Sequence, residues 1–165
     1  MSLFLHVFTG LFLAVGLGLV GYGGSLVLKA NRAASWPTTD GTLIEHRLTQ
    51  RHDGDGSSYQ VKATYAYTVD GTRYESDRIA FGYGASNGRS THESLEQKLG
   101  SGSTVVVRYD PESPQEAVLS RGVNNGIRFL LVFGCTWTLF TIGLHVLVRT
   151  FLSADSALLD NLIVK

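Results

Sequence analysis

The chain has 165 residues, of which 14 are lysine or arginine and 14 are aspartate or glutamate, so its formal net charge at pH 7 is zero. Nucleic-acid-binding domains carry a basic excess, and this balance argues against a nucleic-acid partner. The one cysteine, Cys135, excludes a disulfide within the chain.

An uncharged apolar run lies near the start of the chain, at residues 3–28. An α-helix rises about 1.5 Å per residue, so this run is long enough to cross the roughly 30 Å hydrocarbon layer of a bilayer. A cleaved signal peptide has a basic start and a shorter apolar stretch of about 7–15 residues. Because Met1–Leu5 contains no basic side chain, we predict that residues 3–28 form a retained transmembrane helix.

Residues 29–126 are polar and rich in tyrosine, and we predict that they form a soluble β domain. From Tyr59 to Val69 apolar and polar residues alternate, which is typical of a strand with one buried face. Asp70-Gly71 follows directly and favours a two-residue hairpin with a returning strand over Thr72–Phe81. Further strands are predicted over Gly41–Leu48, Thr104–Tyr109 and Glu116–Leu119.

One predicted helix interrupts these strands. Ser90 and Glu93 have the spacing of a capping box, Leu95 and Leu99 lie one turn apart, and Gly100 is a natural helix end. The order of three strands, a helix and two strands matches an OB-like five-stranded barrel in which the helix plugs one end. A twisted antiparallel sheet with one packed helix is the alternative.

A second apolar run covers residues 127–148 and contains one charge, Arg128. We predict a second transmembrane helix here, followed by a short amphipathic or disordered tail over residues 149–165. The fold class is therefore membrane α with a small all-β domain between the two helices. Basic residues near the spans number four on the domain side and two on the tail side, which favours a cytoplasmic domain in a bacterial inner membrane.

Small residues recur along one face of each predicted span. Spacings of three and four residues place them on one side of a helix, where they let two helix backbones approach closely in lipid. Such stripes form the contact between the two spans of one chain, or alternatively the contact between copies of the chain in a homo-oligomer. These residues are Gly10, Ala14, Gly18, Gly21 and Ser25 in the first run, and Gly134, Thr138 and Thr141 in the second.

One histidine extends each stripe, His6 before Gly10 and His145 after Thr141. Antiparallel spans place both imidazoles in the same leaflet, near the tail-side surface. Ionisable groups inside spans are uncommon and are read first as functional, and two imidazoles can share a proton, bind a metal or ligate haem. Hydration at the membrane surface explains the pair as well, and we predict neither a metal nor a cofactor.

The soluble domain offers no sequence pattern typical of catalysis. The glycine-rich stretch 82–90 precedes a helix but lacks the Lys-Ser or Lys-Thr pair of a Walker loop, and we interpret it as a surface loop. Ser90, His92 and Glu93 lie at a helix start and point in different directions. We therefore predict a non-enzymatic protein without catalytic residues.

Three motifs carry a family resemblance. Trp36-Pro37 follows the first run, and residues 65–74 form a Y-x-Y-x-V-x-G-x-x-Y hairpin around Gly71. Residues 105–119 read V-x-V-x-Y-D-P-x-x-P-x-x-A-x-L, with Tyr109, Asp110, Pro111 and Pro114 at its centre. Over residues 5–148 the chain resembles a bacterial family of small two-span membrane proteins that is filed as a domain of unknown function. The resemblance implies an architecture and no reaction.

The motif residues also have structural interpretations. Pro111 and Pro114 fix the turn after a strand, because proline ends ladder pairing. Asp110 can accept a hydrogen bond from its own backbone there. Trp36 lies shortly after the first span and suits the membrane interface.

These patterns favour a membrane-anchored interaction or accessory protein that presents a small β domain to a protein partner, with a membrane immunity protein as one version. The lipid bilayer and a protein are the predicted partners. One alternative is an oligomeric channel or small-molecule site formed by the spans, with Thr136, Thr138, Thr141 and His145 lining a pore. Another is a metal or haem protein that uses His6 and His145.

Overall fold

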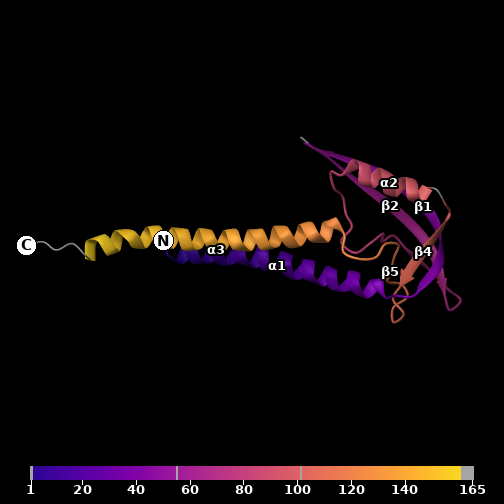
Figure 1. The fold of residues 1–165 in the computed structure, drawn as a ribbon, viewed down its shortest axis with the longest axis horizontal. Coiled ribbons are helices and arrows are strands. Elements are labelled where there is room, and N and C mark those ends of the chain that lie inside the picture. Colours follow the sequence, from indigo (N-terminus) through magenta and orange to yellow (C-terminus); the bar gives the residue numbers. More distant parts are fainter. Residues whose placement is uncertain (1, 55, 101, 161–165) are drawn as a thin grey trace, which may run out of the picture. The chain divides into compact units, whose positions relative to one another are not determined.

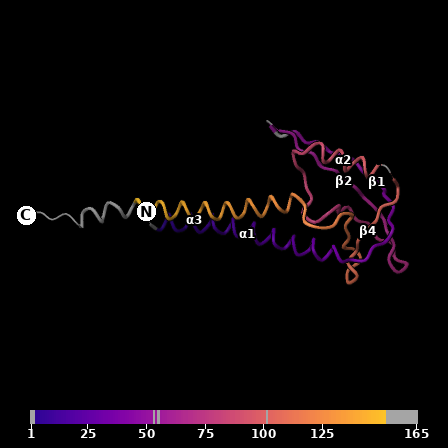
Figure 2. The backbone as a smooth tube through the Cα atoms, in the orientation of Figure 1, coloured from indigo at the N-terminus to yellow at the C-terminus, as the bar shows by residue number. Residues whose placement is uncertain are grey.

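The computed structural model describes residues 2–54, 56–100 and 102–160, and the chain divides into two compact units. One is helical and is formed by the chain up to Gly24 together with the chain from Phe129 onward. The other is a β unit that spans Ser25–Arg128. The smooth backbone trace in Figure 2 follows the chain through both units.

The helical unit consists of most of two long antiparallel helices, α1 (Ser2–Ala34) and α3 (Asn125–Asp160), which lie side by side in Figure 1. Residues 25–34 and 125–128 of these helices belong to the β unit. The two backbones come close where glycine removes a side chain. A methyl group on Gly23 would lie 2.7 Å from the Leu131 side chain. The Trp137 indole N–H donates a hydrogen bond of 3.0 Å to the Phe12 carbonyl across the pair.

Both helices are long and apolar enough to cross a membrane, over Leu3–Ala34 and Asn125–Phe151. Large apolar side chains face outward along them, and Leu3 is 76% exposed and Leu139 70% exposed. Contiguous apolar surface of this size is rare on water-soluble proteins. The helix α3 also continues without a break to Asp160, so the expected tail is not a separate element over residues 149–160, and residues 161–165 lie outside the described part.

The β unit is built on one open antiparallel sheet of five strands in the order β3-β2-β1-β4-β5. The strands β1 (Thr38–Asp53), β2 (Gly56–Val69) and β3 (Thr72–Ser76) precede α2 (Arg89–Gly100). The strands β4 (Thr104–Tyr109) and β5 (Ala117–Val118) follow it. The predicted order of three strands, a helix and two strands is confirmed.

The predicted OB-like barrel is wrong, and the alternative of an antiparallel sheet with one packed helix fits. A barrel requires the two edge strands to pair, but β3 and β5 lie at opposite edges of the sheet. The reason is strand length. β3 leaves the ladder after Ser76 instead of continuing to Phe81, and β5 has only two residues.

The core lies on one face of the sheet, where the predicted alternation along β2 is seen. Tyr65, Tyr67 and Val107 are buried in one cluster, and Val61, Ala63, Ile79 and Leu99 are buried in a second. Leu99 and Leu95 belong to α2, which covers this face over the second cluster. The opposite, outer face is polar and bears the exposed side chains of Ile44 and Val106, and the helix α2 leaves it open.

The start of α3 lies inside the β unit, where two hydrogen bonds and one packing contact hold it. Asn124 donates through its amide to the Phe81 carbonyl at 2.6 Å and accepts from the Ile127 N–H at 3.2 Å, capping the start of α3. The fully buried Ile127 side chain packs on Gly82, which adopts a positive φ of 65°. A side chain at position 82 would overlap Ile127, so glycine is required there.

Candidate binding site at the free edge of β2

The edge of β2 that faces away from β1 has an interrupted hydrogen-bonding ladder. At one end β3 pairs with it through Ser76 and Tyr65. At the other end Ser86 forms an isolated antiparallel bridge with Tyr59. Between these two points residues 77–85 run away from the strand. Their departure is fixed by the Ile79 carbonyl, which accepts hydrogen bonds from the N–H groups of Leu119 and Ser120.

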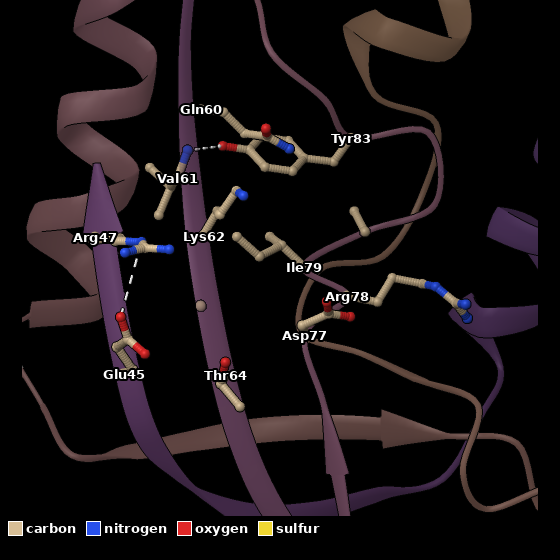
Figure 3. A pocket seen from close by; sticks show the side chains of 12 residues that line it. Glu45, Arg47, Gln60, Val61, Lys62, Thr64, Asp77, Arg78, Ile79 and Tyr83 are labelled. Carbon is tan, nitrogen blue, oxygen red and sulfur yellow. Dashed lines mark hydrogen bonds and ion pairs between the residues drawn. The ribbon is translucent and has the colours of Figure 1, made fainter. Parts of the chain in front are cut away.

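The gap between β2 and this segment is a cavity of about 250 Å³. Figure 3 shows Val61, Lys62 and Thr64 on β2 along one side, with Asp77 and Ile79 on the other. Residues from β1 extend the lining across the outer face of the sheet. The cavity therefore lies entirely within the β unit and is bounded by a strand edge, which carries backbone as well as side-chain groups. We call it the β2-edge cavity.

Backbone groups of Ala63 face this cavity without a partner. Residues two apart on a strand direct their N–H and C=O to the same edge. Tyr59 donates from its N–H to the Ser86 carbonyl at 2.7 Å, and Val61 donates to the Tyr83 hydroxyl at 2.9 Å, both on this edge. Ala63 must direct its groups the same way. No hydrogen bond reaches them there within the described residues, although Ala63 is only 3% exposed, and burying unpaired backbone groups costs free energy.

Charged side chains also line the cavity. Arg47 and Lys62 lie directly opposite each other on β1 and β2, an arrangement that is unfavourable for like charges. Glu45 approaches Arg47 at 3.9 Å, but both side chains are largely exposed and the pair contributes little. Within the described residues no ion pair is formed by Lys62 or by Asp77 on the opposite wall.

Arg78 directs its charge elsewhere. Its guanidinium forms a salt bridge with Glu116 and lies 5.1 Å from the centre of the Phe81 ring. In Figure 3 this side chain extends away from β2. The strand side of the cavity thus carries Arg47 and Lys62, with Glu45 beside Arg47, and its loop side carries Asp77.

Tyr83 forms the end wall of the cavity, and a buried histidine holds it. The Tyr83 hydroxyl accepts from Val61, so its own proton is available for His92 Nδ1 at 2.9 Å. That pattern assigns the imidazole proton to Nε2, which donates to the Ser86 hydroxyl at 2.8 Å. Burial lowers the pKa of His92 and raises the pKa of Tyr83, which keeps both side chains neutral.

The contact between Ser86 and His92 has the distance of a nucleophile and its base, but its surroundings do not support that chemistry. The Ser86 N–H is bound to the Tyr59 carbonyl at 3.0 Å, and the Gly88 N–H points at the Ser86 hydroxyl itself. Neither is available to stabilise an oxyanion. The third group at Nδ1 is a neutral phenol, so no carboxylate stabilises an imidazolium. The contacts instead anchor the loop 82–90 to β2.

The sequence indicated a loop over residues 82–90, but it did not indicate that Tyr83 and Ser86 both contact His92. His92 and Glu93 lie on different sides of α2. Glu93 pairs with Arg89 at 2.6 Å on the exposed side, while His92 is buried. The association of Tyr83, Ser86 and His92 depends on a turn that carries no recognisable motif. The signal that was present is the spacing of six residues from Ser86 to His92 around a helix start.

Apart from the β2–β3 hairpin, the motif residues lie close together around β4 and the start of β1. Tyr109 donates from its N–H to the Pro37 carbonyl at 3.3 Å, and Arg108 donates to the Trp36 carbonyl at 3.2 Å. Asp110 accepts from the Glu112 N–H at 3.0 Å, closing a turn that contains Pro111. The Tyr67 hydroxyl donates to the Pro114 carbonyl at 2.6 Å. Asp70 and Gly71 both have positive φ, as the predicted hairpin turn requires.

The expected small-residue stripes lie differently on the two helices. On α3, Gly134 and Thr141 are buried and Thr138 is half-buried, and a methyl group on Gly134 would approach Val20 at 3.0 Å. On α1 the glycines that lie against α3 are Gly16 and Gly23. The predicted α1 stripe is exposed on the other side of the helix: Gly10, Ala14, Gly18, Gly21 and Ser25. Packing within the chain therefore does not explain that stripe, and the homo-oligomer interpretation stays a prediction.

The two histidines of the helical unit meet. The rings of His6 and His145 lie edge to face with their centres 5.6 Å apart, and His145 Nδ1 lies 3.0 Å from the Thr9 hydroxyl. Two of the three threonines expected to line a pore bond to their own helix, while Thr136 is exposed. Thr138 donates to the Gly134 carbonyl and Thr141 to the Trp137 carbonyl, each at 2.8 Å.

A family model described as a domain of unknown function, DUF3592, matches residues 39–124. The chain belongs to the DUF3592 family. The match confirms the expected membership of a family of unknown function. It covers the β unit, whereas the resemblance in the sequence extended over residues 5–148. The DUF3592 range contains nearly the whole sheet, α2 and the β2-edge cavity, whereas α1 and α3 lie outside it. No curated protein matches the chain.

Proposed function

We propose that this DUF3592 protein is a non-enzymatic, membrane-anchored binding protein whose β domain holds a partner protein at the β2-edge cavity. The observation that carries the proposal is the interrupted ladder beside β2. The buried N–H and C=O of Ala63 lack partners, and Arg47 and Lys62 repel each other across the strands. A polypeptide that occupies the cavity satisfies the backbone groups and compensates the charges.

The sheet supports access for such a partner. α2 covers only the core face, so the outer face around Arg47 and Lys62 is open to another protein. The cavity is also small. Its 250 Å³ lies below the roughly 300–1,000 Å³ of pockets for drug-sized ligands and cofactors. Recognition through a strand edge needs no larger pocket, because main-chain hydrogen bonds supply much of the affinity.

The two long helices support the anchoring part of the proposal. Their outward-facing apolar side chains are suited to lipid rather than water. Basic residues near the two spans are more numerous on the domain side than on the tail side. This difference supports a cytoplasmic position for the domain in a bacterial inner membrane.

Site-specific photo-crosslinking in native membranes tests this proposal. A photoreactive amino acid replaces either Thr64, which lines the cavity, or Arg51, which lies on the outer face of the sheet but outside the cavity. We expect a discrete protein adduct from position 64 and none from position 51. Equal labelling from both positions, or no adduct from position 64, would contradict the proposal.

A second candidate function rests on the histidine pair. Two imidazoles from two helices, with Thr9 holding His145 Nδ1, resemble metal ligands whose second ring nitrogen is oriented by a neighbour. In the described part of the chain no group of three metal-ligating side chains occurs, so any ion would need further ligands. Metal analysis and the visible spectrum of the purified protein decide this. A colourless, metal-free preparation that does not take up Zn²⁺ or haem removes this candidate.

A further inference from the structure

We infer that the β2-edge cavity binds the free C-terminal carboxylate of an extended polypeptide. The inference rests on the proposed function and names the part of the partner that is recognised. It follows from three properties of the cavity, which are its closed ends, the free groups of Ala63 and the two cations beside them.

The ends of the cavity exclude a continuous added strand. The pair Tyr65–Ser76 closes one end and the bridge Tyr59–Ser86 closes the other. Six residue steps along β2 span about 20 Å, and Val61 already donates to Tyr83 within this window. One residue, Ala63, is left with a free donor and a free acceptor. A through-running strand would displace a flanking pair, whereas a chain end of one or two residues fits the 250 Å³ available.

The free groups of Ala63 match one residue of an extended peptide. In antiparallel pairing, two opposed residues exchange an N–H and a C=O in both directions. A peptide end placed opposite Ala63 completes the ladder that β3 begins and Ser86 resumes. An inorganic anion would satisfy only the donor and would leave the buried Ala63 carbonyl unpaired.

The two cations distinguish a carboxylate from other chain ends. Arg47 and Lys62 are cross-strand neighbours beside Ala63, and an anion between them turns their repulsion into two charge-assisted contacts. Arg78 does not compete, because Glu116 holds it. Asp77 on the opposite wall faces the part of the peptide that carries N–H groups or a basic side chain. A free amino terminus would bring a third positive charge to this pair.

Two matched peptide pools test the inference. Both contain acetylated hexapeptides of random sequence; one pool ends in a free carboxylate and the other in a carboxamide. They are titrated into full-length, isotopically labelled protein in detergent micelles while the backbone amide resonance of Ala63 is followed. We expect the carboxylate pool to shift this resonance at concentrations at least tenfold lower than the carboxamide pool.

Charge-neutral variants locate the effect. Arg47→Gln and Lys62→Gln should each weaken the response of the carboxylate pool about tenfold, and Arg51→Gln on the same face should leave it unchanged. All three side chains are exposed, so the fold should be retained, which circular dichroism checks.

Three results would overturn the inference. These are equal responses to both pools, no response to either pool, and a response to inorganic phosphate alone that equals the response to the carboxylate pool. The crosslink from position 64 decides the proposed function separately. A crosslink without a carboxylate preference would mean that a partner binds, but not through its chain end.

Discussion

The hydroxyl oxygen of Tyr83 lies 2.9 Å from the backbone nitrogen of Val61 and thereby joins the loop 82–90 to the free edge of β2. The same hydroxyl reaches His92 at the start of α2. One phenol thus links a strand, a loop and a helix around the β2-edge cavity. Its removal should affect the stability of the β unit as well as the shape of the cavity.

Tyr83→Phe should lower the free energy of unfolding of the β unit by about 1–3 kcal/mol, because it leaves the Val61 N–H and His92 Nδ1 without a partner. Urea titration of the full-length protein in detergent, followed by circular dichroism at a strand wavelength, measures this. Tyr74→Phe is the matched control. The Tyr74 ring stacks on Tyr67, but in the described structure its hydroxyl forms no hydrogen bond. Equal losses in the two variants would show that the hydroxyl contacts of Tyr83 do not matter.

The β unit should lose stability as the pH falls below about 6.5. Burial lowers the pKa of His92 in the folded protein from its usual 6.5. At pH values below 6.5, His92 of the unfolded chain binds a proton that His92 of the folded chain does not bind. Unfolding therefore becomes more favourable as the pH falls, until the lower pKa of the folded state is reached. Thermal unfolding between pH 5 and 7.5 should show this slope in the wild type and a smaller slope in His92→Gln. An unchanged slope would assign the effect to other histidines.

Gly82→Ala should be among the most damaging single methyl additions, at about 2–4 kcal/mol, because it combines a positive φ with an overlap on Ile127. Gly122→Ala separates the two causes. Gly122 has a φ of 85° with nothing within 4 Å of an added methyl, so only the backbone cost of about 1–2 kcal/mol applies. Similar losses in both variants would mean that the contact with Ile127 contributes little.

Gly16→Ile should weaken the packing of α1 on α3, because a side chain there would overlap the Thr138 hydroxyl and come within 3.0 Å of the Trp137 ring. We expect a loss of about 1–3 kcal/mol, measured as a lower midpoint of unfolding in sodium dodecyl sulfate by tryptophan fluorescence. Gly18→Ile places the same side chain where nothing lies within 4 Å and should leave the midpoint unchanged.

The same Gly18→Ile variant tests the exposed α1 stripe as an oligomer contact. If copies of the chain associate through the face that includes Gly10 and Gly18, the variant should reduce crosslinked oligomers in mild detergent while the helix pair stays intact. An unchanged oligomer distribution would leave the stripe without a role in assembly.

Local signals in the sequence predicted much of the fold. The alternation along β2, the Asp70-Gly71 turn and the helix start near Ser90 all appear as expected. Closure of a barrel could not be judged, because it depends on how far β3 extends. That length is set by the distant contact of Ile79 with Leu119 and Ser120, which has no local sequence signal.

The β2-edge cavity was beyond sequence reasoning for a related reason. Alternation identifies which side chains are buried, but it does not show which backbone groups lose their partners when a neighbouring strand ends early. On α1 the ambiguity was different. Small residues occur on two faces, and the spacing of Gly16 and Gly23 is as compatible with packing as that of Gly10 and Gly18. Only the position of Trp137 and Leu131 on α3 selects between them.

Solvent protection inside native membranes tests the central claim most directly. In a Cys135→Ser background, Thr64→Cys places a thiol in the β2-edge cavity and Arg51→Cys places one outside it. We predict that a membrane-impermeant maleimide modifies position 64 at least tenfold more slowly in opened native membranes than after purification, while position 51 reacts at the same rate in both. Equal rates at position 64 in the two preparations would contradict occupation of the cavity by a partner.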